Sequence, residues 1–337
     1  MKALIAKENA DPEAPPSARL ELADKERPAP GPGEVLVKIE AATCNPSDLH
    51  YLKGEYGVPP EWGAAAGFEG AGIVVESGGG FFAGRLKGKR VAVASAGGEG
   101  VWAEYLLANA KTCMPINKAV PPEQAATFIV NPFTAFGLLD RAVALGSQAV
   151  IVNAAASQVG RLVIRMAKPR AIDVIAIVRR EEQRLALVAI GAEHVLLSTD
   201  SDFEKQLHAA AHEKKARVAF DCIAGPATAQ LLTAMPTHST VIVYGRLHRD
   251  PDDLYGGRYP VGHMIFAGDQ IEGFWLSYDI KRLGLWRLLR RSKELQKMFR
   301  DGLIKTEIQS RSAIEDFPAA VDTYALNMSA GKAILEF

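Results

Sequence analysis

A turn of small residues between a predicted strand and a predicted helix is the first feature that could do chemistry. Residues 148–153 (QAVIVN) form the apolar run of a buried strand, and 154–160 (AAASQVG) lead directly into a helical stretch. Backbone N–H groups at such a helix N-terminus can bind a pyrophosphate when small side chains let the ligand approach. The candidate phosphate-binding residues are Ser157, Gln158, Val159 and Gly160. An ordinary tight turn is the alternative, because only one glycine of a GxGxxG motif is present.

Two consecutive arginines follow the next predicted strand. This strand covers residues 173–178 (DVIAIV), and Arg179 and Arg180 come directly after it. An NAD-preferring domain usually has an acidic residue at this place for the ribose 2′-hydroxyl, whereas a guanidinium can bind the 2′-phosphate of NADP through two hydrogen bonds. The pattern favours NADPH over NADH as cofactor. The alternative is an exposed strand end, where arginine is common.

These candidate residues lie in a region where strands and helices alternate. Further apolar strands are predicted at 216–221 and 239–244. Continuous apolar strands alternating with helices are typical of a parallel sheet covered on both faces. Residues 122–280 are therefore predicted to form a doubly wound parallel-sheet (Rossmann) domain that binds NADP.

The residues before 122 have a different pattern of predicted strands and turns. Strand-like runs at 34–39, 72–76 and 90–94 are separated by glycine-rich turns. Short strands at this spacing are typical of a small β-rich barrel. Residues 1–121 are predicted to form this second domain of an α/β protein.

The end of the chain combines a basic helix with a final strand. Residues 281–300 are rich in lysine and arginine, and 332–337 (KAILEF) are strand-like. The helix has a predicted apolar side of Leu285, Leu288, Leu289, Leu295, Met298 and Phe299. It could bind an acidic carrier protein or the phosphates of coenzyme A, lie on a membrane surface, or simply face solvent.

Composition excludes several classes of function. The 337 residues contain 39 Lys plus Arg against 39 Asp plus Glu, and the pI is near 7.1. A neutral chain has no broad electrostatic surface for nucleic acid or an anionic membrane. Three scattered cysteines build neither a disulfide framework nor a four-cysteine zinc cluster. With no signal peptide and no apolar run of about 18–20 residues, we expect a soluble, cytoplasmic protein.

Five segments, taken in order, resemble the medium-chain dehydrogenase/reductase superfamily. They are APGPGEVLVKI, GFEGAGIVVESG, VNPFTAFGLLDRA, VIVNAAASQVGRLVIRMAK and VAFDCIAG, and the chain also begins with a similar MKAL. The resemblance implies a GroES-like barrel domain followed by a Rossmann domain. It also implies that residues 281–337 return to complete the barrel domain.

Within that superfamily, the chain resembles the zinc-independent branch. Zinc enzymes place one Cys early, a His in a GHE segment and a later Cys around the metal. Here Cys44 stands at the first place, Phe68 replaces the His in GFEG, and the segment around Asn131 has no Cys. One thiolate cannot hold a zinc ion that needs three protein ligands. The resemblance therefore implies a reductase with NADPH and without zinc.

Two zinc-independent families remain candidates. Residues 45–57 (NPSDLHYLKGEYG) and 273–277 (GFWLS) resemble 2-enoyl thioester reductases, whereas Tyr56 is also typical of NADPH:quinone oxidoreductases. The first resemblance implies hydride transfer to the β-carbon of an activated C=C in an enoyl thioester, enal or enone. Tyr56 is the candidate catalytic donor, because a phenol can donate a hydrogen bond or relay a proton at neutral pH. An NADPH-binding structural or regulatory protein with vestigial catalysis is a third hypothesis.

The resemblance also implies a set of cofactor contacts. Asn131 and Thr134 would lie beside the nicotinamide, Arg179 and Arg180 at the 2′-phosphate, and the 157–160 turn under the pyrophosphate. The remaining implied cofactor-binding residues are Asn45, Cys222, Tyr244, Gly245, Phe274, Trp275 and Leu276. The strand holding the last three would pair two subunits, so we expect a homodimer, with a tetramer as an alternative, acting on a small-molecule or acyl-thioester substrate.

Overall fold

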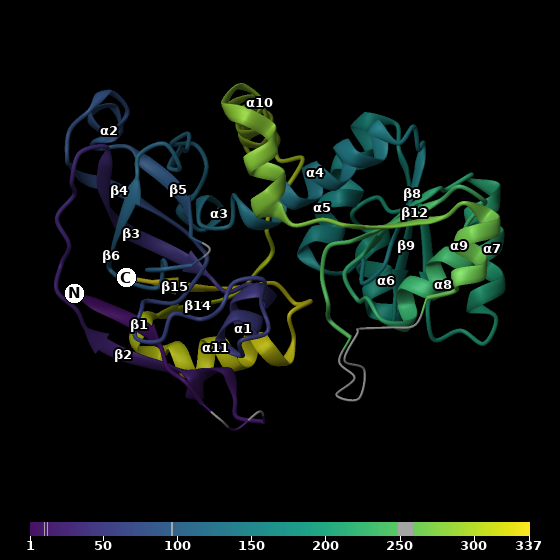
Figure 1. The fold of residues 1–337 in the computed structure, drawn as a ribbon, viewed down its shortest axis with the longest axis horizontal. Helices are drawn as coiled ribbons and strands as arrows, with labels where there is room; N and C mark the ends of the chain where they lie inside the picture. Colours follow the sequence, from purple (N-terminus) through teal and green to yellow (C-terminus); the bar gives the residue numbers. More distant parts are fainter. Residues whose placement is uncertain (10, 12, 96, 249–258) are drawn as a thin grey trace. The chain divides into compact units, whose positions relative to one another are not determined.

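A computed structural model describes residues 1–337 except 10, 12, 96 and 249–258 (Figure 1). Its contacts divide the chain into two compact units. The first unit is Met1–Pro132 with Ser292–Phe337, and the second is Phe133–Arg291. The boundaries of these units fall later in the chain than the predicted domain boundaries at 121 and 280.

A seven-stranded sheet forms the frame of the first unit. Its strand order is β14-β15-β3-β4-β5-β7, and β6 pairs with β3. The strands are β3 (Glu34–Thr43), β4 (Glu69–Ser77), β5 (Arg90–Ala94), β6 (Tyr105–Asn109), β7 (Met114–Pro115), β14 (Ile308–Ala313) and β15 (Lys332–Glu336). The predicted runs at 34–39, 72–76 and 90–94 are confirmed as strands. The antiparallel pairing of β15 with β3 brings the end of the C-terminal segment to this sheet, whereas residues 281–291 of the predicted segment belong to the second unit.

Gly72 of β4 is required because β3 and β4 approach each other closely at that position. A Cβ on Gly72 of β4 would lie 2.0 Å from the carbonyl oxygen of Lys38 on β3. The register of the β3–β4 pair also shifts twice along its length. Only glycine allows the two strands to remain this close at that point, and the strands carry the buried residues of the unit's core.

Short elements complete the first unit. They are the hairpin β1 (Lys2–Ala6) and β2 (Leu20–Asp24), the helices α1 (Pro46–Leu52), α2 (Phe81–Leu86), α3 (Pro122–Ala125) and α11 (Phe317–Leu326), and the 3-10 turns η1 (Pro16–Arg19) and η3 (Ile314–Asp316). Of these, α1 matters most for the candidate site, because it leaves the carboxyl end of β3 through Cys44 and Asn45.

The second unit contains a six-stranded parallel sheet with the order β10-β9-β8-β11-β12-β13. The strands are β8 (Ala149–Val152), β9 (Asp173–Val178), β10 (His194–Leu197), β11 (Val218–Asp221), β12 (Thr240–Val243) and β13 (Gln270–Gly273). Numbered from β8, this is the order 3-2-1-4-5-6 of doubly wound dinucleotide-binding folds. The predicted parallel sheet is therefore confirmed.

Helices precede, connect and follow these strands. They are α4 (Val130–Ala144), α5 (Gln158–Ala167), α6 (Glu181–Val188), α7 (Phe203–Glu213), α8 (Pro226–Ala234), α9 (Val261–Ala267) and α10 (Leu276–Arg300), with the 3-10 turn η2 (Lys168–Arg170) after α5. In the doubly wound order, neighbouring connections reverse direction between β8 and β11. The carboxyl ends of these two strands thus define the crevice where ligands of such sheets bind.

The predicted apolar side of the 281–300 helix is only partly right. Gly284 interrupts α10 with φ 71° and ψ 162°. Leu285 is 52% exposed, Leu289 42% and Trp286 84%, whereas Leu295 is fully buried. Because the helix restarts after Gly284, the apolar spacing does not describe one continuous buried face.

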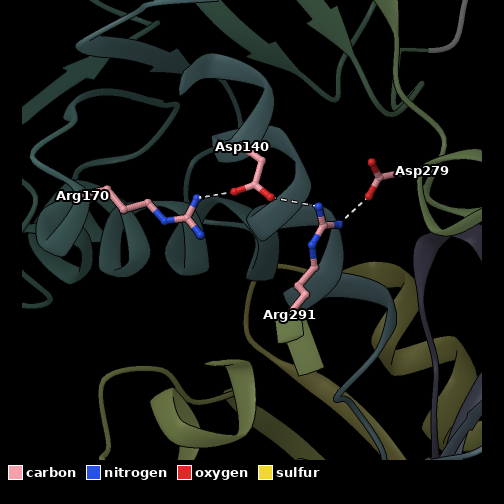
Figure 2. Close-up of polar contacts among 4 residues, drawn as sticks. All are labelled: Asp140, Arg170, Asp279 and Arg291. Carbon is pink, nitrogen blue, oxygen red and sulfur yellow. Dashed lines mark hydrogen bonds and ion pairs between the residues drawn. The ribbon is translucent and has the colours of Figure 1, made fainter. Parts of the chain in front are cut away.

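A charged network holds the two parts of α10 against α4 (Figure 2). The buried guanidinium of Arg291 donates to Asp279 at 2.5 Å and to Asp140 of α4 at 2.9 Å, and Arg170 donates to Asp140 at 3.0 Å. Asp279 precedes the break at Gly284 and Arg291 follows it. The network therefore fixes the segment just after β13 relative to the second unit's sheet.

Candidate active site and cofactor site

The turn after β8 has the geometry of a phosphate-binding turn. Ser157 is the N-cap of α5, and its hydroxyl accepts a hydrogen bond from the Gly160 amide at 3.2 Å. A Cβ on Gly160 would lie 2.4 Å from the carbonyl oxygen of Ala155, so this close packing requires glycine. Ala154 takes φ 43°, a conformation that usually favours glycine. The first-turn amides of α5, including those of Gln158 and Val159, thus lie at the carboxyl end of β8.

Two residues that the sequence analysis did not single out fix this crevice. The Asn153 amide donates to Asp221 at 2.5 Å and accepts from the Cys222 backbone N–H at 2.9 Å. Asp221 also accepts hydrogen bonds from Ile223, Ala224 and Thr228. Asn153 directly follows β8 and Asp221 ends β11, so a polar residue at the end of each apolar run was the available signal.

Three predicted cofactor residues lie together at the carboxyl ends of β11 and β12. A Cβ on Gly245 would approach the Cys222 carbonyl oxygen to 3.0 Å. The Tyr244 hydroxyl is buried close to the Cys222 thiol, and no described group forms a hydrogen bond of normal geometry with it. Burial raises the pKa of Cys222 to about 12, so the thiol stays protonated. The close packing at Gly245 and the buried Tyr244 hydroxyl fit a crevice that binds a dinucleotide.

The arginines after β9 are exposed. Arg180 is the N-cap residue of α6, and Arg179 lies between it and the strand. The neighbouring carboxylate of Glu181 is bound by Arg184 at 2.6 Å. No hydrogen bond or ion pair joins the guanidinium of Arg179 or Arg180 to any residue that the structure describes. Two guanidinium groups that are not paired with a described carboxylate therefore lie at this end of the crevice.

The segment 274–276 follows the edge strand rather than forming part of it, which corrects the prediction. β13 ends at Gly273, and α10 begins at Leu276. The Phe274 amide donates to the carbonyl oxygen of Val243 at 2.8 Å, at the end of β12. A Cβ on Gly137 of α4 would meet the Phe274 ring at 2.8 Å. Phe274 and Trp275 thus lie at the carboxyl end of the sheet, where a cofactor binds in this topology.

In the first unit, Tyr56 packs on an aromatic base. Its ring centroid lies 5.0 Å from that of Phe68, and Tyr51 of α1 contacts Phe68 at 5.1 Å. The Tyr51 hydroxyl accepts a hydrogen bond from the Glu61 amide at 2.8 Å. Asp48 of α1 accepts one from the Phe68 amide at 2.8 Å. Phe68 is therefore held by Asp48 and supports the Tyr56 ring.

A buried polar cluster adjoins this aromatic base. The Lys332 ammonium donates to Asn45 Oδ1 at 2.5 Å, and Asn131 Nδ2 donates to the same oxygen at 3.0 Å. Asn45 Nδ2 donates to Glu69 at 3.2 Å. The other Glu69 oxygen accepts from the amides of residues 129 and 130, at 2.5 and 2.8 Å. We call Asn45, Glu69, Asn131 and Lys332 the Lys332 cluster.

Burial shifts the proton affinities in and around this cluster. It raises the pKa of Asp48 to about 7 and that of Glu69 to about 7. It lowers the pKa of Lys332 to about 8, against the attraction of the neighbouring acidic groups. A lysine that is still mostly charged at pH 7 therefore faces two carboxyl groups that titrate near neutrality. Sequence analysis missed Lys332 and Glu69, because each lies in an otherwise apolar strand pattern.

Comparison with known proteins identifies the family. Residues 31–118 match the family profile described as Alcohol dehydrogenase GroES-like domain, and residues 159–290 match the profile described as Zinc-binding dehydrogenase. The chain is 30% identical over 304 residues to the mitochondrial enoyl-[acyl-carrier-protein] reductase of Arabidopsis thaliana, covering 86% of this chain and 76% of that protein. The chain belongs to the medium-chain dehydrogenase/reductase superfamily.

Solved structures of superfamily members have the same architecture. A Mesorhizobium loti protein, provisionally described as an NADPH:quinone reductase, is 36% identical with a TM-score of 0.90, covering 100% of this chain and 98% of that one. The quinone oxidoreductase of Thermus thermophilus, solved also in complex with NADPH, shares the fold with a TM-score of 0.80 at 22% identity and full coverage of both chains. The predicted GroES-like and Rossmann folds of the two units are thus confirmed.

The zinc-ligand positions of the superfamily hold a different set of side chains here. Cys44, expected at the first ligand position, is buried in the first unit's core, where burial raises the pKa of its thiol. Its neighbour Asn45 faces Asn131 instead. Among the described residues, no group of three or more His, Cys, Asp or Glu side chains could hold a metal ion.

The described helices were compared with the length and hydropathy that a membrane span requires. None of them is both long and apolar enough to cross a bilayer.

Proposed function

We propose that this chain is an NADPH-dependent, zinc-independent reductase of activated C=C bonds, acting on 2-enoyl thioesters or related enals and enones. The observation that carries the proposal is the crevice of the second unit, with the α5 turn at its centre and two exposed arginines at its end. The relative named enoyl-[acyl-carrier-protein] reductase supports the substrate class. The structural relative named an NADPH:quinone reductase keeps quinone reduction as the alternative.

The residues divide into cofactor holders and a proton donor. The α5 turn would hold the pyrophosphate, Arg179 and Arg180 the 2′-phosphate, and the segments around Asn131 and Phe274 the nicotinamide end. Bound NADPH would supply a hydride to the β-carbon of the substrate. Tyr56 would donate to the enolate that forms, so that a proton ends on the α-carbon and the C=C becomes a single bond.

A substrate panel tests the proposal. NADPH oxidation is followed with a short and a long enoyl-CoA, an enone, and quinones of one and two rings. We expect turnover with the thioesters. If quinones alone react, the enoyl reductase proposal is wrong; if nothing reacts although NADPH binds, the third hypothesis, a binding protein with vestigial catalysis, replaces it.

The cofactor preference gives a sharper prediction. Arg179→Ala should weaken NADPH binding by about 1.5–3 kcal/mol, the cost of losing a charged hydrogen bond, and leave NADH binding nearly unchanged. Dissociation constants from fluorescence titration measure both effects. Arg184→Ala is the matched control, because that guanidinium is bound to Glu181. Equal losses for both cofactors would remove Arg179 from the 2′-phosphate site.

We also propose a homodimer, with a tetramer as the alternative, in the reducing cytoplasm. The outer edge of β13 carries no neighbouring strand in the described sheet, and Val261, Ile265 and Phe266 of α9 are exposed nearby in sequence. All three cysteines are free and buried, which suits a reducing compartment. Sedimentation equilibrium gives the oligomeric state.

A further inference from the structure

We propose that Asn131 presents its amide oxygen, rather than its NH2 group, to the bound ligand, and that Lys332 and Glu69 are positioning residues that impose this direction. The ligand group that Asn131 recognises is therefore a hydrogen-bond donor. Naming that ligand as the nicotinamide end of NADPH rests on the proposed function. The direction of the amide does not.

The argument begins at Lys332, which can only donate hydrogen bonds. Its ammonium has three N–H groups and three acceptors: Asn45 Oδ1 at 2.5 Å, the Tyr324 hydroxyl at 3.0 Å and the Cys44 carbonyl oxygen at 3.2 Å. The Asn45 atom that faces Lys332 must therefore be the oxygen. The opposite orientation of the Asn45 amide would place its NH2 group against the Lys332 ammonium, where two donors would meet.

Glu69 fixes the other end of the same amide. One of its oxygens accepts two backbone N–H groups at the start of α4, and the other lies 3.2 Å from the Asn45 nitrogen. In its ionised form this carboxylate only accepts hydrogen bonds. The Asn45 amide is thus oriented by Lys332, an obligatory donor, and by Glu69 whenever that carboxyl group is ionised.

Asn131 takes its direction from Asn45. Its nearest amide atom lies 3.0 Å from Asn45 Oδ1 and must be the NH2 group, because two oxygens would repel. Asn131 Oδ1 is then the amide atom that does not face Asn45, and no described residue donates a hydrogen bond to it. Its ligand partner is a hydroxyl or an N–H group, which on a nicotinamide nucleotide means a ribose hydroxyl or the carboxamide.

The variant Asn131→Asp tests the direction through its pH dependence. A protonated aspartic acid can donate its O–H to Asn45 Oδ1 and still present a carbonyl oxygen, whereas an ionised one can only oppose Asn45 Oδ1. The titratable groups facing this place are Lys332 of β15, Glu69 of β4, Asp48 of α1, Tyr324 of α11 and Cys44, so each value is taken relative to the wild type at the same pH. Asn131→Leu, which can do neither, is the control.

The first readout is binding of NADP⁺, which tolerates acid, by calorimetry from pH 5.5 to 8.5. We expect Asn131→Asp to bind about tenfold more weakly than the wild type at pH 8.5 and within about threefold at pH 5.5, whereas the ratio for Asn131→Leu stays constant.

A ligand analogue identifies the group that Asn131 recognises. The 3-acetylpyridine analogue of NADP⁺ lacks the amide N–H. If the wild type loses affinity for it and Asn131→Leu does not discriminate, the carboxamide is the donor; equal discrimination by both assigns the ribose hydroxyl.

The second readout is the melting temperature without ligand over the same pH range. Asn131→Asp should approach the wild type as the pH falls. A variant that is closest to the wild type at high pH, or whose deficit does not change with pH, would overturn the proposed direction. Wild-type protein that fails to bind NADP⁺ would instead contradict the proposed function, and the melting curves would still decide the direction of the amide.

Discussion

Lys332→Met should lower the free energy of unfolding by roughly 3–5 kcal/mol at pH 7.5, and by about 1–2 kcal/mol less than that at pH 5.5. At the higher pH the substitution removes the cation from beside Glu69 and Asp48, which lie in a buried site. Removing one partner of a buried charge pair leaves the other charge without compensation. Methionine fills nearly the same volume, so the loss reports charge and hydrogen bonds rather than a cavity.

The sign of the pH dependence follows from the carboxyl groups. Burial raises the pKa of Asp48 and Glu69 to about 7, and the charge of Lys332 lowers both values. A group whose pKa is raised by folding contributes stability at low pH that is lost as the pH rises through the folded pKa. Without Lys332 both values rise further, so the variant should lose more stability than the wild type as the pH rises through 7.

Chemical denaturation at the two pH values measures this difference. Lys38→Met is the matched control, because Lys38 is an exposed residue of β3 in the same unit. The control should unfold like the wild type at both pH values. A Lys332→Met deficit that is equal at pH 5.5 and 7.5 would contradict the charge argument and indicate a packing role instead.

Tyr56→Phe should reduce the turnover number about 10²-fold or more while NADPH affinity stays nearly unchanged. The phenyl ring would keep the packing on Phe68, so the variant loses only the hydroxyl. A positioned proton donor typically contributes 10²–10⁴-fold to the rate. Steady-state kinetics with the best substrate of the panel, together with fluorescence titration of NADPH, separate the two quantities.

Tyr51→Phe is the control for this variant. Tyr51 also packs its ring against Phe68, but its hydroxyl accepts a hydrogen bond from the Glu61 backbone amide. We expect lower thermal stability and little change in turnover. If Tyr56→Phe turns over like the wild type, Tyr56 has no part in the chemistry.

The parts of the fold that the sequence predicted best are those with local causes. β5 and β9 have the predicted bounds because a short apolar run is bounded by polar residues on both sides. Gly160 could be identified because a helix packed directly against a strand turn needs a residue without a side chain. The predicted apolar side of α10 was only partly right, because the break at Gly284 has no signature beyond a single glycine.

The Lys332 cluster could not be predicted in this way. Asn45 and Lys332 are 287 positions apart, and their contact depends on the pairing of β15 with β3. Neither residue belongs to a motif with a fixed spacing to the other. The resemblance named Asn45 and Asn131 as cofactor residues, but only the structure shows that the two amides bind each other.

The long distance along the chain between Asn45 and Lys332 also has a consequence during synthesis on the ribosome. Residues 133–291 are continuous, so the second unit can form its sheet as soon as they have emerged. The first unit cannot, because β14 and β15 follow the second unit in the chain and Lys332 is among their residues. Until then, Glu69 and Asp48 have no lysine to compensate them. Most of the first unit is thus translated before the second unit but completed after it.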